Sequence, residues 1–262
     1  MELREVIGNR RSIRYLDPER AVELDKIQRM LEAARIASHF GNNNAVQALV
    51  VHRETATEEQ VASLPSPVGG FQMKLAPVVI IWYVESNAMD EAAERLRELV
   101  HCGALGYGPN KVNELEETLV PLFRSISDAL KGPGMVDMDL GQAVAQATLV
   151  AVEQGLGTCC QGSADWSKVE KAFGLPASCR IVVVQTVGYP LESADGGGQR
   201  PRLPFEKLFQ LNAYDTPFPR SDEVVDELTE NRLLQPEAPQ PGREEEIEAI
   251  RKKYDLPGSG MI

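Results

Sequence analysis

Apolar residues recur along much of the chain at the spacing of helices. They return every three or four positions over 23–37 and again over 112–130, the pattern of a helix with one buried face. Over 139–154, small and apolar residues surround nearly the whole helix, so we expect this helix to be central and buried. Shorter stretches of helical pattern cover residues 2–8, 90–101, 166–173 and 243–254.

Three short apolar runs predict strands. Residues 48–51 and 181–184 are continuous runs typical of covered strands, and 78–84 is rich in β-branched and aromatic residues. The segment 55–75 is weakly patterned, and its prolines and glycines predict mostly loop (Pro65, Pro67, Gly69, Gly70). Few strands, long helices and no strict alternation of the two predict an α+β fold rather than a doubly wound sheet.

The chain divides into a main part and a tail. We expect one domain over 1–214, with a helical insertion at about 86–137, and then an acidic C-terminal tail over 215–262. Prolines make this tail extended rather than compact, with its last helix as the exception (Pro217, Pro219, Pro236, Pro239, Pro241).

Composition and charge exclude some partners. The 262-residue chain has a net charge of −12 at pH 7, which argues against nucleic acid because phosphate binding needs a clustered positive field. No apolar stretch approaches the roughly 20 residues that span a bilayer, and residues 1–5 lack an apolar signal core. We therefore expect a cytoplasmic protein with neither a nucleic-acid nor a membrane partner.

The usual metal and nucleotide motifs are missing from the sequence. The four cysteines form no CxxC pair and no histidine lies at metal-ligand spacing from them, so we expect neither a metal site nor a structural disulfide (Cys102, Cys159, Cys160, Cys179). The glycines of 103–108 and 155–162 miss the GxGxxG pattern that follows a strand, and no Gly-Lys-Ser/Thr triplet occurs.

Arginines crowd two short segments of this acidic chain. In Arg-Arg-Ser-Ile-Arg at 10–14, the alternation of an extended segment places Arg10, Ser12 and Arg14 on one side. Two guanidinium forks and a hydroxyl suit a phosphate or an electron-rich ring edge. Arg200 and Arg202 form a second group. A solvated basic surface is the alternative interpretation of both segments.

The order of several motifs resembles the nitroreductase family over about residues 3–210. Arg-Arg-Ser-Ile-Arg precedes a helix that ends in Glu-Ala-Ala-Arg, and a small-residue loop with Asn and a short apolar strand follow it. A buried helix then leads into Gly-Leu-Gly-Thr-Cys, a strand ends in Gly-Tyr-Pro, and an Arg-x-Arg-x-Pro element closes the set. These motifs occupy 10–14, 32–35, 41–42, 48–51, 155–159, 188–190 and 200–204.

The resemblance implies a mixed or antiparallel sheet flanked by helices, in an intertwined homodimer that binds FMN at its interface. The basic residues and Ser12 would hold the phosphate and the pyrimidine edge of the flavin (Arg10, Arg11, Ser12, Arg14, Arg200, Arg202).

Two further groups of residues would surround the flavin ring. Asn42 would hydrogen-bond the ring, with Asn44 where the family often has Gln, and Ser38 and His39 would come from the partner subunit. A loop would lie against one face of the ring, with the Gly162 N–H reaching flavin N5 (Cys160, Gln161, Gly162, Ser163). Ser38-His39 and Asn44-Ala45-Val46 depart from the family's usual Pro-Ser and Gln-Pro-Trp, which weakens inference about the substrate.

The implied activity is ping-pong transfer of electrons from NADH or NADPH to a nitroaromatic, a quinone or a similar small acceptor. No catalytic side chain is expected, because the cofactor performs the chemistry. Two alternatives stay open. One is a flavin store or sensor without turnover, if His39 or Phe40 blocks the ring, and the other is a dimeric structural protein with a vestigial site. Family dimers exchange C-terminal segments, so we expect the tail either to wrap the partner or to be solvated.

Overall fold

An antiparallel sheet forms the centre of the molecule. The computed structural model describes residues 1–64, 70–163, 165–193, 199–237 and 241–256, and within them the sheet has four strands. Their order is β1(Val46–His52), β2(Val78–Glu85), β4(Cys179–Gly188) and β3(Gly157–Gln161), and each neighbouring pair is antiparallel. This arrangement confirms the predicted α+β fold.

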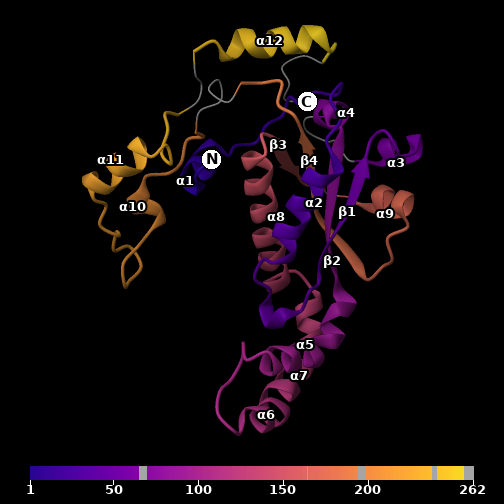
Figure 1. Ribbon diagram of the computed structural model, residues 1–262, viewed down its shortest axis with the longest axis vertical. Coiled ribbons are helices and arrows are strands. Elements are labelled where there is room, and N and C mark those ends of the chain that lie inside the picture. Colours follow the sequence, from indigo (N-terminus) through magenta and orange to yellow (C-terminus); the bar gives the residue numbers. More distant parts are fainter. Residues whose placement is uncertain (65–69, 164, 194–198, 238–240, 257–262) are drawn as a thin grey trace.

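The two faces of the sheet are covered by different helices (Figure 1). On strand β2, Ile80 and Trp82 face α2(Leu24–Arg35) and α8(Met135–Glu153) in the larger core. Val79 and Ile81 face a second core beneath α3(Glu58–Ser63), α4(Gly70–Leu75) and α9(Ser167–Phe173). Successive side chains of a strand alternate between its faces, so a strand covered on both sides is apolar throughout.

Several helices outside the two cores also follow the predicted pattern. The structure places α1 at Leu3–Asn9, α5 at Ala92–His101 and α12 at Arg243–Lys253. The helix predicted over 112–130 is a continuous run of α6(Lys111–Glu114), the π-turn η3(Leu115–Leu119) and α7(Val120–Lys131).

The prediction of mostly loop over 55–75 was wrong where the structure describes it. Helix α3 begins at a capping box, in which the Thr57 hydroxyl accepts from the Gln60 N–H and the Gln60 side chain accepts from the Thr57 N–H. Helix α4 buries Phe71 and Leu75. Pro65, Pro67 and Gly69 lie outside the described residues.

Helix α8 is buried on one side only, which corrects the expectation of a fully buried helix. Leu140 and Ala147 pack in the larger core, whereas Gly141 and Ala145 are exposed and Met138 is 56% exposed. The apolar character around the whole helix therefore extends to a surface that this single chain does not cover.

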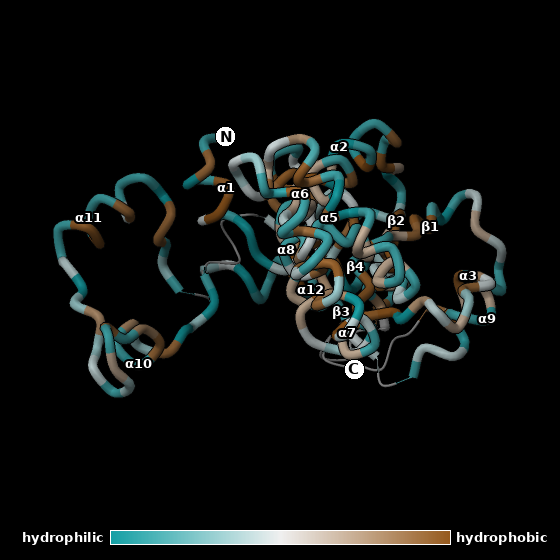
Figure 2. Tube along the Cα trace, turned by 90° about the horizontal axis from the view of Figure 1, so that it is seen from below, coloured by the Kyte–Doolittle hydropathy of each residue, from teal (hydrophilic) through white to brown (hydrophobic). Residues whose placement is uncertain are grey.

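Two parts of the chain project from the body (Figure 1). One is a helical projection of η2(Ser86–Glu91), α5, α6, η3 and α7, with a small core of its own that includes Leu96 and Val120. The other is an arm, residues 199–235, which contains α10(Phe205–Leu208) and α11(Asp222–Glu230) and stands apart from the body (Figure 2).

The tail has more regular structure than its prolines predict. Helix α11, capped by the Ser221 hydroxyl, was not expected, and α12 returns to pack on the body. Pro239 lies outside the described residues. Among the described helices, none combines the length and the apolar character needed to cross a lipid bilayer.

Candidate functional site

The Arg10–Arg14 segment is extended and lies against the start of strand β3. Ser12 forms a parallel bridge with Thr158, and the Ile13 N–H donates to the Thr158 carbonyl at 2.9 Å. Arg10, Ser12 and Arg14 are half-buried on one side, which confirms the predicted alternation, whereas Arg11 points into the protein on the other side.

Glycine at position 157 permits this close approach. A Cβ atom at Gly157 would lie 2.7 Å from the Cβ of Ile13, closer than carbon atoms pack. Only a residue without a side chain therefore lets the arginine segment rest on β3.

The two arginine groups, at positions 10–14 and 200–202 of the sequence, meet at one cavity. A cavity of about 240 Å³ lies between the end of α1 and the inner end of the arm. Burial lowers the pKa of Arg200, and the nearby Arg14 and Arg243 lower it further. Among the described residues, eight line this cavity, and four of them are arginines (Ile7, Arg10, Arg11, Gln199, Arg200, Arg202, Leu233, Leu234).

This cavity has the donor chemistry of an anion site. Converging guanidinium groups repel one another, and an anion with several acceptor oxygens relieves that repulsion. The Arg11 Nε is buried and has no hydrogen-bond partner among the described residues, although its Nη2 donates to the Ser193 carbonyl. The residues present therefore fit a phosphate group.

A buried carboxylate holds the backbone of the arginine segment in place, and the sequence analysis did not identify it. The Glu192 carboxylate accepts from the backbone N–H groups of Arg14 at 2.6 Å and Tyr15 at 3.2 Å, and it pairs with Arg243. Its partners are 178, 177 and 51 residues away. No local sequence signal identifies it, because its role depends only on tertiary contacts.

The segment 160–163 is brought beside the arginine segment. Cys160 and Gln161 belong to β3 rather than to the expected loop, because they pair with Gln185 and Val184 of β4. Gly162 follows the strand end, and a Cβ atom there would meet no atom within 4 Å. Burial raises the pKa of the Cys159 thiol, which is therefore protonated near neutral pH.

The loop over residues 38–44 is held by a second buried carboxylate that sequence reasoning missed. Asp139, near the start of α8, accepts from the Phe40 N–H and from the Asn43 side chain, both at 2.9 Å. Asn42 and Asn44 have positive φ angles of 57° and 54°, a conformation that asparagine tolerates better than most residues.

His39 and Asn44 line a second pocket, of about 350 Å³, against β1 and Trp82. The His39 Nε2 is buried and has no hydrogen-bond partner among the described residues. Ser38 is exposed. The His39 imidazole therefore offers an unpaired nitrogen in this pocket, whereas the Asn44 amide donates to the Asn42 carbonyl at 2.7 Å.

Within one chain, the structure does not bring the two halves of the predicted site together. The 38–44 loop is bonded to Asp139 near the start of α8, and the arginine segment bridges to Thr158, just beyond the end of α8. At a rise of 1.5 Å per residue, Asp139 and Gly155 lie roughly 24 Å apart. Ser38, His39, Asn42 and Asn44 thus lie far from Arg10, Ser12, Arg14 and Gly162.

Comparison with known proteins gives matches over most of the chain. The sequence model of the nitroreductase family matches residues 7–108 and 114–189. The Bacillus subtilis (strain 168) protein YdgI, which bears the name of an NAD(P)H nitroreductase, is 25% identical over 205 residues, covering 78% of this chain and 94% of YdgI.

Solved structures share the fold. A protein of Exiguobacterium sibiricum 255-15, named as a nitroreductase and crystallised with FMN, has a TM-score of 0.64 at 23% identity, covering 81% of this chain and 98% of its own. The gut-bacterial enone reductase CLA-ER has a TM-score of 0.61 at 18% identity, with coverage of 81% and 98%.

Proposed function

Because the chain belongs to the nitroreductase family, we propose that it is an FMN-dependent NAD(P)H oxidoreductase that works by a ping-pong mechanism. The observation that carries the proposal is the meeting of Arg10 and Arg11 with Arg200 and Arg202 at one cavity beside the end of β3. The Exiguobacterium protein binds FMN, and YdgI is named for NAD(P)H.

The residues at the arginine cavity would hold the phosphate of FMN. Arg10, Arg200 and Arg202 offer forked donors to its oxygens, and Arg11 closes the inner wall. Ser12 and Arg14 share the side of Arg10 and would face the flavin, with Gly162 at the neighbouring strand end. The positive charge of Arg14 would favour the negative charge that a reduced flavin carries. When bound, FMN supplies the hydride-accepting centre between donor and acceptor.

A homodimer would complete the site. A ligand at the arginine cavity reaches a 38–44 loop only if a second copy supplies that loop, since the chain's own loop lies at the far end of α8. The open apolar face of α8, with Met138, Gly141 and Ala145, would be covered in such a dimer. We propose that the two copies pack through this face.

The arm would reach the second copy. Its aromatic residues cluster with one another, since Phe205 lies 4.8 Å from Phe209 between ring centroids, while Phe209 stays 51% exposed and Tyr214 91% exposed. A cluster of exposed apolar side chains marks an interaction surface. This supports exchange of the arm between subunits. Residues 1–214 would form the FMN-binding domain, and the arm would extend from the end of this domain into the tail. Helix α12 would be the part of the tail that returns to its own body.

The acceptor would be a small molecule such as a nitroaromatic, a quinone or an enone, the last being the substrate class in the name of CLA-ER. Storage of flavin without turnover remains the alternative function. Its premise was a blocked flavin face, but Phe40 stacks on Phe123 of its own chain, with ring centroids 5.2 Å apart. That contact supports turnover over storage.

Steady-state kinetics test the proposal. Oxidation of NADPH and of NADH is followed at several fixed concentrations of a quinone, without oxygen. Ping-pong turnover gives parallel double-reciprocal lines. Intersecting lines contradict the mechanism, and absence of turnover by an FMN-loaded protein supports the storage function instead.

A further inference from the structure

Helix α12 lies outside the part of the chain that matches the family, and it docks behind the arginine segment. Ile250 of α12 is 9% exposed and packs with Tyr15, Phe71 and Leu75. Tyr15 directly follows Arg14 and stacks on Phe71, with ring centroids 5.1 Å apart. Helix α12 therefore shares a small core with Tyr15, the residue next to the Arg10–Arg14 segment that lines the cavity.

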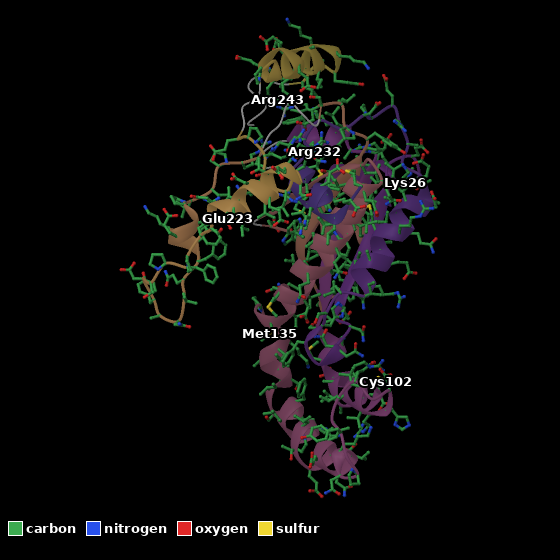
Figure 3. All side chains as sticks on the ribbon, turned by 60° about the vertical axis from the view of Figure 1, so that its left-hand side comes forward. Lys26, Cys102, Met135, Glu223, Arg232 and Arg243 are labelled. Atoms are coloured by element: carbon green, nitrogen blue, oxygen red, sulfur yellow. The ribbon has the colours of Figure 1, made fainter. Side chains whose placement is uncertain are left out.

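Polar contacts connect the same two parts. Arg243, at the start of α12, lies between that helix and the body and pairs with Glu192 (Figure 3). Glu246, one turn later, accepts from the Ser193 N–H at 2.6 Å and also pairs with Arg243 at 3.2 Å. Arg11 donates to the Ser193 carbonyl. Residues 192–193 are thus held between the arginine segment and α12.

The two oxygens of the Glu192 carboxylate have different partners. One oxygen accepts the N–H groups of Arg14 and Tyr15, and the other pairs with Arg243. The Glu192 side chain has no exposed surface, and the Arg243 side chain is 18% exposed. A buried carboxylate is stable only when it is paired, so loss of Arg243 leaves Glu192 free to turn toward other cations or water. The backbone of Arg14 would then lose its anchor.

We propose that Arg243 is a positioning residue, which acts through Glu192 to fix the backbone of Arg14 and Tyr15 so that the arginines are preorganised for the phosphate of a flavin nucleotide. The inference rests on the proposed function. Helix α12 thereby holds the arginine segment from the side that faces away from the cavity. Ligand binding in the arginine cavity and docking of α12 against Tyr15 and Glu192 then stabilise each other, because thermodynamic coupling between two sites is reciprocal.

The test compares Arg243→Met and Arg243→Lys with Lys252→Ala, a control on the same helix whose side chain is 76% exposed. Hydrogen exchange at the amides of Arg14 and Tyr15 is measured in the full-length protein without ligand, and the Kd for FMN is measured by quenching of flavin fluorescence. The affinity for riboflavin, which lacks the phosphate, is measured in parallel.

Arg243→Met should speed exchange at both amides and weaken FMN binding about tenfold, the equivalent of one lost charge-assisted hydrogen bond. Arg243→Lys should recover part of the affinity, because it keeps the charge but not the fork, and Lys252→Ala should match the wild type. Where Arg243→Met does not fold, Arg243→Lys carries the test, with an expected loss of about threefold, which is roughly half the free energy of the tenfold loss expected for Arg243→Met.

Unchanged exchange at Arg14 and Tyr15, or unchanged FMN affinity in a folded Arg243 variant, overturns this inference and leaves the proposed function intact. An equal loss of riboflavin and FMN affinity also overturns it, because displacement of the 10–14 segment should cost the phosphate contacts of Arg10 as well as the ring contact of Arg14. A wild-type protein that binds no FMN overturns the proposed function, and the inference with it.

Discussion

Single residues set the shape of the candidate site, and the sequence reveals some of them more readily than others. Alternation along an extended segment correctly placed Arg10, Ser12 and Arg14 on one side. The same rule puts Arg11 on the buried side, where it lines the cavity from within and reaches Ser193. Glu192 and Asp139 could not be predicted, because each acts on backbone groups that only the folded chain brings near.

At the residue scale, the cavity arginines should matter through the phosphate. Replacing Arg200 by Met should weaken FMN binding by roughly 1.5–3 kcal/mol, the value of a hydrogen bond to a charged group, with little effect on riboflavin. Fluorescence titration with the two flavins measures this, and Arg29→Met serves as a control because Arg29 is 61% exposed and lines neither the arginine cavity nor the pocket at His39. Equal losses for both flavins would show that Arg200 does not contact the phosphate.

A second residue-scale prediction concerns Gly157. A methyl group there would overlap Ile13 and push the arginine segment off β3. Gly157→Ala should therefore lower the free energy of unfolding by about 1–3 kcal/mol, as overpacking does. Urea unfolding measures the change, with Gly132→Ala as the control because a Cβ there meets nothing closer than 3.8 Å. A Gly157→Ala protein as stable as the wild type would contradict this packing.

At the scale of elements, the apolar pattern located three of the four described strands and most helices, but it missed β3 and did not show what covers each element. Helix α3 was missed although its Thr57 and Gln60 form a capping box that is visible in the sequence. Helix α8 was expected to be buried all round, because its sequence does not distinguish a face in the core from an apolar face that the chain leaves exposed. The pattern reports how apolar each face is and leaves the identity of the neighbour open.

The element-scale prediction concerns the link between α8 and the 38–44 loop. Asp139→Ala removes a buried acceptor from the Phe40 N–H and the Asn43 amide, which leaves both donors unsatisfied. We expect a loss of about 2–4 kcal/mol in the free energy of unfolding and faster hydrogen exchange at Phe40. Glu153→Ala, an exposed position on the same helix, should change neither. Protection at Phe40 that survives the Asp139 substitution would contradict the assigned contact.

At the scale of the whole molecule, the two halves of the candidate site lie at opposite ends of α8. The motifs identified the residues of both halves but not the distance between them. That distance depends on which end of α8 each segment contacts, and only the folded chain shows those contacts. The second copy that we propose would resolve this separation and would also cover the apolar face of α8. The arm, with Phe209 and Tyr214 exposed, fits the same arrangement.

The whole-molecule prediction tests that arrangement at Ala145, which is exposed in the single chain. Ala145→Arg should convert a dimer to monomers in sedimentation equilibrium and reduce FMN binding at the same time, because a buried unpaired charge opposes association. Lys168→Glu, on the exposed surface of α9, should leave the dimer intact. An Ala145→Arg protein that remains dimeric with full FMN binding would place the interface elsewhere.

The central claim, that this chain is a flavoenzyme, is tested most directly by the visible spectrum of the protein after equilibration with FMN, gel filtration and addition of NADH or NADPH without oxygen. We expect a yellow protein with one FMN per chain, whose flavin band bleaches when the donor is added. A protein that emerges colourless, with no FMN retained, would contradict the assignment of this chain as a flavoenzyme.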